Sequence, residues 1–303
     1  MIDKIKKILS NKKSIVLLPE SDKLYYECLN YMFDNAVILV DERFEDYNLL
    51  VNEINSKAEK IYFVNFFNLY RNILPGVNKN IEKNEIFLCN IGNLTSPFIL
   101  PIFYDIIEFY ERKLIDNIYA LDDSAYRILK HANYNVFKFD CKLPFNKDVI
   151  NTDCKKNTSI GIISNDYDPV HNFYNMLTAV SMVKDYEVVK FVPYMNASRE
   201  FFNHFSIKHE FCDNLNDAMN NNFVNLYSNF TNTNPCLVIK SMDNGIPCIL
   251  GNTDLFDNNK KLKELLVLKS DDDVNEIADK INSIRDNYDV IFKEYIKWRK
   301  DYV

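Results

Sequence analysis

The stretch VNLYSNFTNTNPCLVIKSMDNGIPCILGNTDLF, residues 224–256, carries the clearest structural pattern in the chain. An apolar strand ends at Ser228, a polar loop follows, Pro235 begins a helix and Gly245 ends it. Loops beyond the carboxyl ends of parallel strands form the ligand crevice of such sheets, and a helix start offers N–H groups to an anion. The stretch therefore predicts a site suited to a diphosphate.

The same alternation of strand and helix continues on both sides of this stretch. In the second half of the chain the strands are expected at 159–164, 188–192, 207–211, 223–228, 248–250 and 265–268. The helices between them are expected at 171–183, 197–204, 215–219 and 236–242. The acidic run that begins at Ser270 is suited to cap a helix, and apolar spacing then predicts two terminal helices, near 274–284 and 291–298.

The first half shows a similar pattern. Near-continuous apolar runs predict buried parallel strands at 15–18, 36–40, 60–64, 85–89, 118–121 and 136–139, with helices between them, for example at 24–33 and 47–58. The pattern lapses over residues 141–157, which we interpret as a linker. We therefore predict an α/β protein with two Rossmann-like doubly wound parallel-sheet domains, at residues 1–145 and 146–303.

Composition narrows the classes of ligand and the cellular location. The 36 basic and 43 acidic residues give a formal charge of -7, so nucleic acid is not expected as a partner. The seven cysteines are scattered, without a CxxC pair, which is typical of reduced thiols in a cytoplasmic protein. No export signal is expected, and the apolar run 98–115 contains charged residues that favour a buried helix over a membrane span.

Several familiar catalytic signatures do not occur in the sequence. It contains no GxGxxG turn, no GxxxxGK[ST] loop, no GxSxG elbow and no HExxH pair. These absences make a simple dehydrogenase, a kinase, an α/β-hydrolase or a zinc protease poor interpretations. No histidine stands at zinc-ligand spacing from the cysteines, so no metal site is predicted.

Residues 240–247, KSMDNGIP, resemble the donor-site signature of retaining GT-B-type glycosyltransferases of family 4, whose helix ends in E-A-M-x-x-G-x-P. Gly245 and Pro247 match that pattern in register. The likeness also covers the strand and helix at 161–183 and the terminal helices, which together make up roughly the last half of the chain. The resemblance implies a GT-B-like architecture with an acceptor-side first domain and a donor-binding second domain.

The resemblance also implies which residues hold the donor. Family members carry two glutamates with seven residues between them, and Asn232 and Lys240 stand at those positions here. His171 and Asn172 match a Lys followed by Gly or Asn that contacts the donor phosphates, and Asn165 lies near the place of the usual arginine. The full set of expected donor-binding residues is Asn165, His171, Asn172, Ser228, Thr231, Asn232, Asn234 and Lys240. Alternatively, the asparagines are turn residues, Lys240 is a solvated helix lysine and His171 is a surface residue.

Acceptor contacts are expected from the loop after strand 85–89. Asn90, Asn93 and Thr95 are the candidates, although an ordinary strand-to-helix turn explains the same residues. The sequence contains no obvious catalytic nucleophile, so we expect catalysis by positioning and charge stabilisation. No metal or other cofactor is expected besides the nucleotide-sugar donor.

The sequence thus predicts a hexosyltransferase that moves a sugar from a nucleoside diphosphate donor to a cell-surface polysaccharide or a protein glycan. Peripheral membrane association and a partner glycosyltransferase are compatible with it. A catalytically silent relative that acts as a binding or partner subunit is the alternative, because neither expected glutamate is present. A third reading is another sugar-nucleotide enzyme on the same fold, such as an epimerase.

Overall fold

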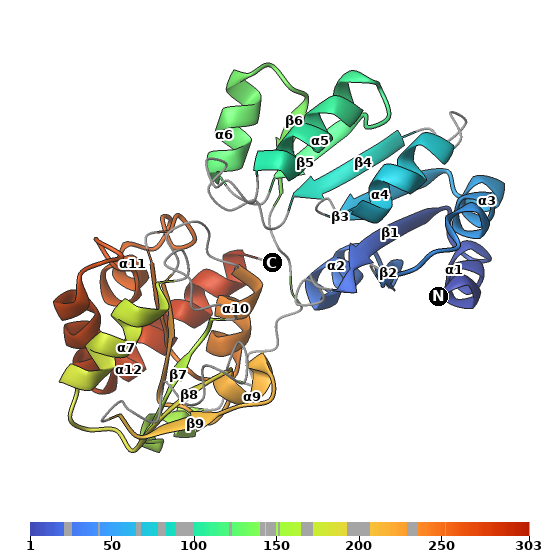
Figure 1. The fold of residues 1–303 in the computed structure, drawn as a ribbon. Helices are drawn as coiled ribbons and strands as arrows, with labels where there is room; N and C mark the ends of the chain where they lie inside the picture. The colour runs from blue at the N-terminus through green and yellow to red at the C-terminus, as the bar shows by residue number, and fades with distance from the viewer. Residues whose placement is uncertain are drawn as a thin grey trace. The chain divides into compact units, whose positions relative to one another are not determined.

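The computed structural model describes residues 1–20, 26–41, 43–64, 68–77, 83–88, 100–120, 123–139, 143, 150, 152–164, 172–192, 207–228, 235–251 and 253–302. The chain folds into two compact units, Met1–Leu143 and Pro144–Val303. Each unit is an α/β layer structure around its own parallel sheet (Figure 1). The fold class expected from the sequence is therefore confirmed.

The first unit contains a six-stranded sheet with strand order β2-β1-β3-β4-β5-β6, all parallel. Its strands are β1 (Ser14–Pro19), β2 (Val37–Val40), β3 (Lys60–Val64), β4 (Lys83–Leu88), β5 (Asn117–Ala120) and β6 (Val136–Lys138). Its helices are α1 (Ile2–Leu9), α2 (Tyr26–Met32), α3 (Tyr47–Lys57), α4 (Asn68–Ile73), η2 (Leu74–Gly76), α5 (Leu100–Glu111) and α6 (Asp123–His131). All six expected strands form, with small differences at their ends.

The main core of the first unit lies on one face of its sheet. Helices α1, α3, α4, α5 and α6 all contribute to it, for example through Ile5, Leu50, Tyr70 and Ile106, which are fully buried. This follows from the topology, because right-handed crossovers that run in one direction along a sheet place their helices on the same face. Helix α2 connects β1 to β2 in the opposite direction, and none of its described side chains belongs to this cluster.

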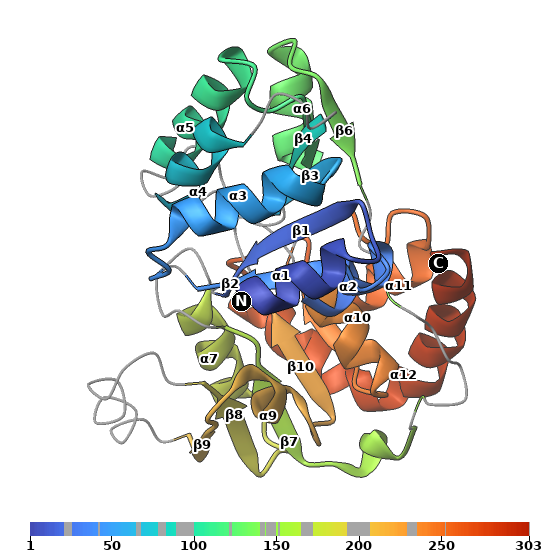
Figure 2. The same cartoon turned by 90° about the vertical axis from the view of Figure 1, so that its right-hand side faces the viewer.

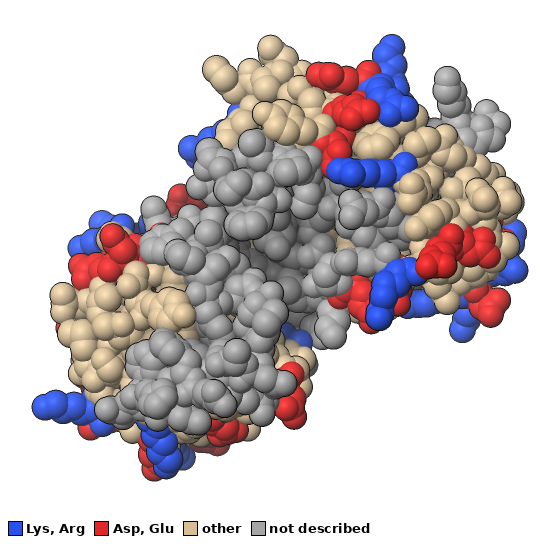
Figure 3. Space-filling model, in the orientation of Figure 1, with Lys and Arg blue, Asp and Glu red and all other residues tan. Residues whose placement is uncertain are grey.

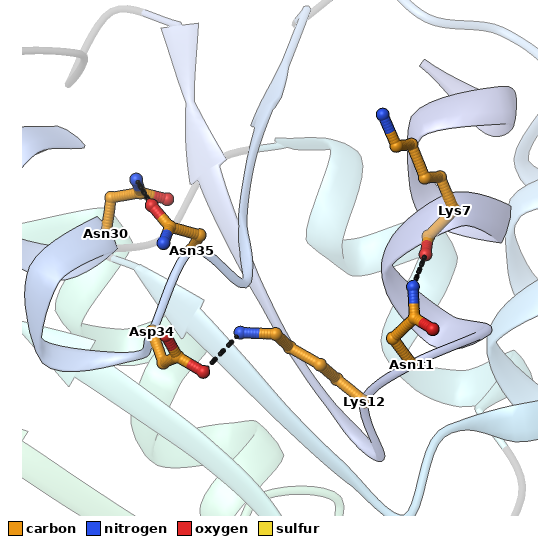
Figure 4. Close-up of polar contacts among 6 residues, drawn as sticks. All are labelled: Lys7, Asn11, Lys12, Asn30, Asp34 and Asn35. Atoms are coloured by element: carbon orange, nitrogen blue, oxygen red, sulfur yellow. Dashed lines mark hydrogen bonds and ion pairs between the residues drawn. The ribbon is translucent and has the colours of Figure 1, made fainter.

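Polar contacts join two turns at the amino-terminal edge of the first sheet (Figure 4). Lys12, just before β1, forms an ion pair with Asp34 at 2.8 Å, and Asn30 donates to Asn35 over 2.6 Å. Asp34 and Asn35 both have positive φ, and the N–H of Asn35 returns to the carbonyl of Asn30, which closes the end of α2. This cluster lies at the edge opposite to the one where ligands bind in such sheets.

The second unit contains a five-stranded parallel sheet with strand order β11-β10-β7-β8-β9. Its strands are β7 (Ser159–Ile162), β8 (Val188–Phe191), β9 (His209–Phe211), β10 (Val224–Tyr227) and β11 (Cys248–Leu250). Its helices are η4 (Thr152–Lys156), α7 (Phe173–Met182), α9 (Leu215–Met219), α10 (Pro235–Asp243), α11 (Lys260–Leu266) and α12 (Val274–Asp301). Figures 1 and 2 show these elements from two sides, and in Figure 1 α7 and α12 lie on one side of the sheet while α9 and α10 lie on the other.

Two predictions for the end of the chain are wrong. Residues 265–268 do not form a strand, because Asn259 caps α11 and Leu262 and Leu266 bury one helical face, so that only an isolated bridge joins Leu250 to Val267. The two expected terminal helices are one, α12, because Tyr288 continues the buried stripe across the polar segment. Asp273 caps this helix, as the acidic run predicted, by accepting from the N–H groups of Asn275 and Glu276.

The remaining expectations concern two helices and the cysteines. Helix α1 was not expected, and the helix expected at 197–204 lies outside the described residues. Cys154, Cys212 and Cys248 are free and buried, as expected for reduced thiols. Cys28 and Cys236 participate in disulfide bonding, so the prediction of reduced thiols is wrong for these two.

Candidate functional site

The strand order of the second unit contains one topological switch point, between β7 and β10. The chain proceeds from β7 to β8 on one side and from β10 to β11 on the other, so the connections that leave β7 and β10 diverge. Ligands of doubly wound sheets bind in the crevice that opens at this point, beyond the carboxyl ends of the strands. Residues that follow β7 and β10 are therefore the first candidates for a site.

Asn172 directly precedes α7 at this edge and has an unusual backbone conformation. Its φ of 52° and ψ of 22° place it in the left-handed region, and its side chain is 3% exposed. The side-chain amide donates to the hydroxyl of Ser228 over 2.7 Å and to the main-chain oxygen of Asp271. Asn and Gly tolerate the left-handed region better than other residues, which accounts for the expected Gly or Asn at this position.

Ser228 directly follows β10 and is 2% exposed. Its N–H donates to the sulfur of Met176 on α7 at 3.4 Å, and its hydroxyl donates to a carboxylate oxygen of Asp271 at 3.4 Å. The structure therefore brings together two of the predicted donor-binding residues, Asn172 and Ser228, at the switch point. It adds Asp271, which the sequence pattern assigned only to a helix-capping run.

Helices α7 and α10 both begin at the edge where these residues meet. Helix α7 begins after Asn172, whose side chain makes no capping hydrogen bond, and Pro235 is the first residue of α10. The first N–H groups of any α-helix have no acceptor within the helix, and the helix dipole adds partial positive charge there. Such an arrangement can bind phosphate oxygens without a metal ion.

Lys240 lies elsewhere on α10, in its last turn. It is half-buried on a helix whose residues Pro235 to Ile239 are all buried. Among the described contacts, no hydrogen bond joins Lys240 to Asn172 or Ser228, and its assignment to the donor site stays a prediction.

The remaining predicted site residues lie outside the described residues. These are the donor-side residues Asn165, His171, Thr231, Asn232 and Asn234 and the acceptor-side residues Asn90, Asn93 and Thr95. Their assignment stays a prediction.

Perturbed pKa values occur at the far end of α10. Burial raises the pKa of Asp243, while a hydrogen bond from Tyr295 and the charge of Arg299 act in the opposite direction. Tyr295 donates to Asp243 over 2.7 Å, and the fully buried Arg299 forms an ion pair with it at 3.4 Å. These contacts attach α12 to the carboxyl end of α10, so we interpret the shift as structural rather than as a catalytic signal.

The described residues show mixed charge on the face drawn in Figure 3 and no group of metal ligands. On the face in Figure 3, the described basic and acidic side chains are interspersed rather than gathered by sign. Within the described ranges, no group of three or more His, Cys, Asp or Glu side chains is arranged to hold a metal ion. No helix in those ranges is long and apolar enough to cross a membrane.

Comparison with solved structures identifies the fold over nearly the whole chain. The structure of Alr3699/HepE from Anabaena, in complex with UDP and glucose, matches with a TM-score of 0.67 at 9% identity and covers 96% of this chain and 94% of its own. Sucrose-phosphate synthase from Thermosynechococcus elongatus matches with a TM-score of 0.65 at 10% identity, covering 96% and 94%. A glycosyltransferase from Rickettsia africae matches with a TM-score of 0.62 at 9% identity, covering 96% and 93%.

The sequence itself matches no family model and no curated protein. At identities of 9–10% the structural likeness establishes the fold alone. The chain has the GT-B fold of these glycosyltransferases, with two Rossmann-like domains. The narrower likeness to family 4 rests on residues 240–247 and stays a prediction.

Proposed function

We propose that this protein is a glycosyltransferase that transfers a sugar from a nucleoside diphosphate donor to a glycan or protein acceptor. The observation that carries the proposal is the convergence of Asn172, Ser228 and the starts of α7 and α10 at the switch point of a GT-B second unit. The likeness to a structure that holds UDP and glucose supports the choice of ligand. We infer residues 146–303 to be the donor-binding domain and residues 1–145 to be the acceptor-side domain.

In the proposed reaction the protein stabilises the departing diphosphate. The N–H groups at the two helix starts meet phosphate oxygens as negative charge develops on them, and this needs no metal ion. Lys240 and His171 supply positive charge, and Asn232 and Asn234 hydrogen-bond the sugar or ribose hydroxyl groups. A cell-surface polysaccharide or a protein glycan is the proposed acceptor.

Calorimetry with UDP and a thermal-shift screen of UDP-sugars test the donor class. We expect UDP to bind with a micromolar to millimolar dissociation constant and at least one UDP-sugar to raise the melting temperature. Release of UDP from that sugar nucleotide, with and without EDTA, tests turnover and metal independence. Failure of every UDP compound to bind would refute UDP as the nucleotide of the donor.

A silent binding subunit is the second candidate, favoured by Asn232 and Lys240 at positions where the resemblance expects glutamates. In a silent relative, Asn232→Glu combined with Lys240→Glu should increase binding of a UDP-sugar, because it restores the carboxylates. In a working enzyme the same double substitution should weaken binding, because it places negative charge beside the diphosphate. Calorimetry on both proteins distinguishes the two cases, and a partner glycosyltransferase belongs to the silent case.

A further inference from the structure

Three segments that are far apart in the sequence meet at the switch point of the second unit. Asn172 directly precedes α7, Ser228 follows β10, and Asp271 precedes α12. We call these three residues the switch-point cluster. Hydrogen bonds join each member to the other two.

Asn172 and Ser228 are both predicted to bind the nucleotide-sugar donor. Within the cluster, the side-chain N–H and O–H groups of these two residues already have acceptors. The amide of Asn172 has two N–H bonds, and they go to the Ser228 hydroxyl and to the main-chain oxygen of Asp271. The only hydroxyl proton of Ser228 goes to the Asp271 carboxylate. The side-chain oxygen of Asn172 accepts from Asn175 over 2.7 Å. A phosphate or sugar oxygen therefore finds no spare side-chain donor on Asn172 or Ser228.

We propose that Asp271 is a positioning residue for the donor site. Its carboxylate orients the Ser228 hydroxyl as an acceptor for Asn172, and its main-chain oxygen holds Asn172 in the left-handed conformation that begins α7. Asn172 and Ser228 then support binding of the nucleotide-sugar donor by positioning the start of α7. Their side chains do not hydrogen-bond the nucleotide sugar directly. The inference rests on the proposed function for the identity of the ligand.

The neighbouring aspartates have different partners, which makes Asp271 distinct within its acidic run. Asp272 is exposed and accepts from the hydroxyl of Ser270 over 2.5 Å. Asp273 caps α12. Asp272→Ala is therefore a matched control, because it removes an adjacent carboxylate of the same charge that does not contact Asn172 or Ser228.

The test compares Asp271→Ala, Asp271→Asn and Asp272→Ala in the full chain. Calorimetry with UDP should show affinity about tenfold weaker for Asp271→Ala, since loss of an orienting hydrogen bond to a charged group is of that order. Asp271→Asn keeps an acceptor oxygen and should recover most of the affinity, while Asp272→Ala should stay within about twofold of the unaltered protein. Hydrogen exchange should become faster at the N–H of Met176, which bonds to the carbonyl of Asn172 at 3.2 Å.

The outcomes separate this inference from the proposed function. Failure of the unaltered protein to bind UDP would refute the proposed function with UDP as the donor nucleotide. Binding by the unaltered protein with equal affinity for Asp271→Ala would refute the positioning role alone. A lower melting temperature for Asp271→Ala with unchanged UDP affinity would show that the cluster is only structural. Unchanged exchange at Met176 would show that the carboxylate of Asp271 does not help to hold the start of α7.

Discussion

The side-chain amide of Asn225 in β10 donates a hydrogen bond over 2.8 Å to the hydroxyl of Ser241 on α10. Asn225 also donates to the carbonyl of Met219 over 3.0 Å and accepts from Asn222 at 2.8 Å. The hydroxyl of Ser241 in turn donates to the carbonyl of Ile246. All three polar side chains are 0–1% exposed, so this network connects α9, β10 and α10 beneath the proposed donor site.

The network predicts that Gly161 tolerates no side chain. A Cβ atom at Gly161 would collide with the side-chain amides of Asn222 and Asn225 and would lie 2.6 Å from the carbonyl of Ala218. Gly161→Ala should therefore lower the free energy of unfolding by about 1 to 3 kcal/mol, the usual cost of overpacking a core. Urea unfolding followed through Trp298, the only tryptophan, measures this in the second unit.

Gly76→Ala is the comparison for that experiment. Its Cβ would lie 3.1 Å from a methyl group of Val51, which can move aside. We expect a loss of about 1 kcal/mol or less by circular dichroism. Equal stability of Gly161→Ala and the unaltered protein would mean that the buried amides can move without cost.

The backbone of Asn172 gives a second prediction. Asn172→Gly keeps access to the left-handed conformation but loses the hydrogen bonds to Ser228 and Asp271, so it should cost about 1 to 3 kcal/mol of stability. Asn172→Ala loses the same bonds and adds about 1 to 2 kcal/mol for a φ of 52°. Chemical denaturation of both variants should rank Ala below Gly, and the reverse order would show that the left-handed geometry is not required.

Thiol reactivity gives a third prediction. Cys154, Cys212 and Cys248 are buried, and burial raises the pKa of each thiol, most strongly for the fully buried Cys248. Since the thiolate is the reactive form, iodoacetamide at pH 8 should modify them slowly in the native protein and quickly after unfolding in urea. Peptide mass spectrometry identifies each site, and rapid native modification of Cys248 would contradict its burial.

Much of the fold could be predicted from the sequence because apolar runs and turn residues agree over most of the chain. The run at 265–268 shows where this fails, since a short apolar run fits a strand or a helix equally well. The hydrogen bond between Asn259 and the N–H of Leu262, together with burial of Leu266, decides for a helix, and the burial is a tertiary contact. The polar segment before Tyr288 led to the wrong prediction of two terminal helices for the same reason. The hydroxyl of Tyr288 donates to the carbonyl of Gly245, and this is a tertiary contact of the folded unit.

The candidate site could be predicted in part. The strand end at Ser228 and the helix start at Asn172 follow from local pattern, and the structure joins them. Asp271 could not be singled out, because it stands in a run of three aspartates that all suit a helix cap. Only the return of this segment to the switch point separates Asp271 from Asp273, and that return depends on how α12 packs against α7 and α11.

The ion pair between the half-buried Asp243 and the fully buried Arg299 gives the last prediction, a pH dependence of stability. Burial raises the pKa of Asp243 in the folded protein above its ordinary value of 3.8, despite the opposing effects of Tyr295 and Arg299. The protonated form is then relatively favoured by folding. The stabilisation of the folded state by protonated Asp243 is fully present below about pH 3.8. It is lost as the pH rises through the pKa of Asp243 in the folded protein.

Asp243→Asn removes this titration. Urea unfolding between pH 4 and pH 7 should therefore show the variant gaining stability relative to the unaltered protein as the pH rises. We also expect a difference in the free energy of unfolding that does not depend on pH, because the variant removes the carboxylate that pairs with the fully buried Arg299. Asp279→Asn, which changes an exposed carboxyl group on the same helix as Arg299, is the control. A stability difference between Asp243→Asn and the unaltered protein that stays constant over this range, or that moves in the opposite direction, would show that folding does not raise the pKa of Asp243.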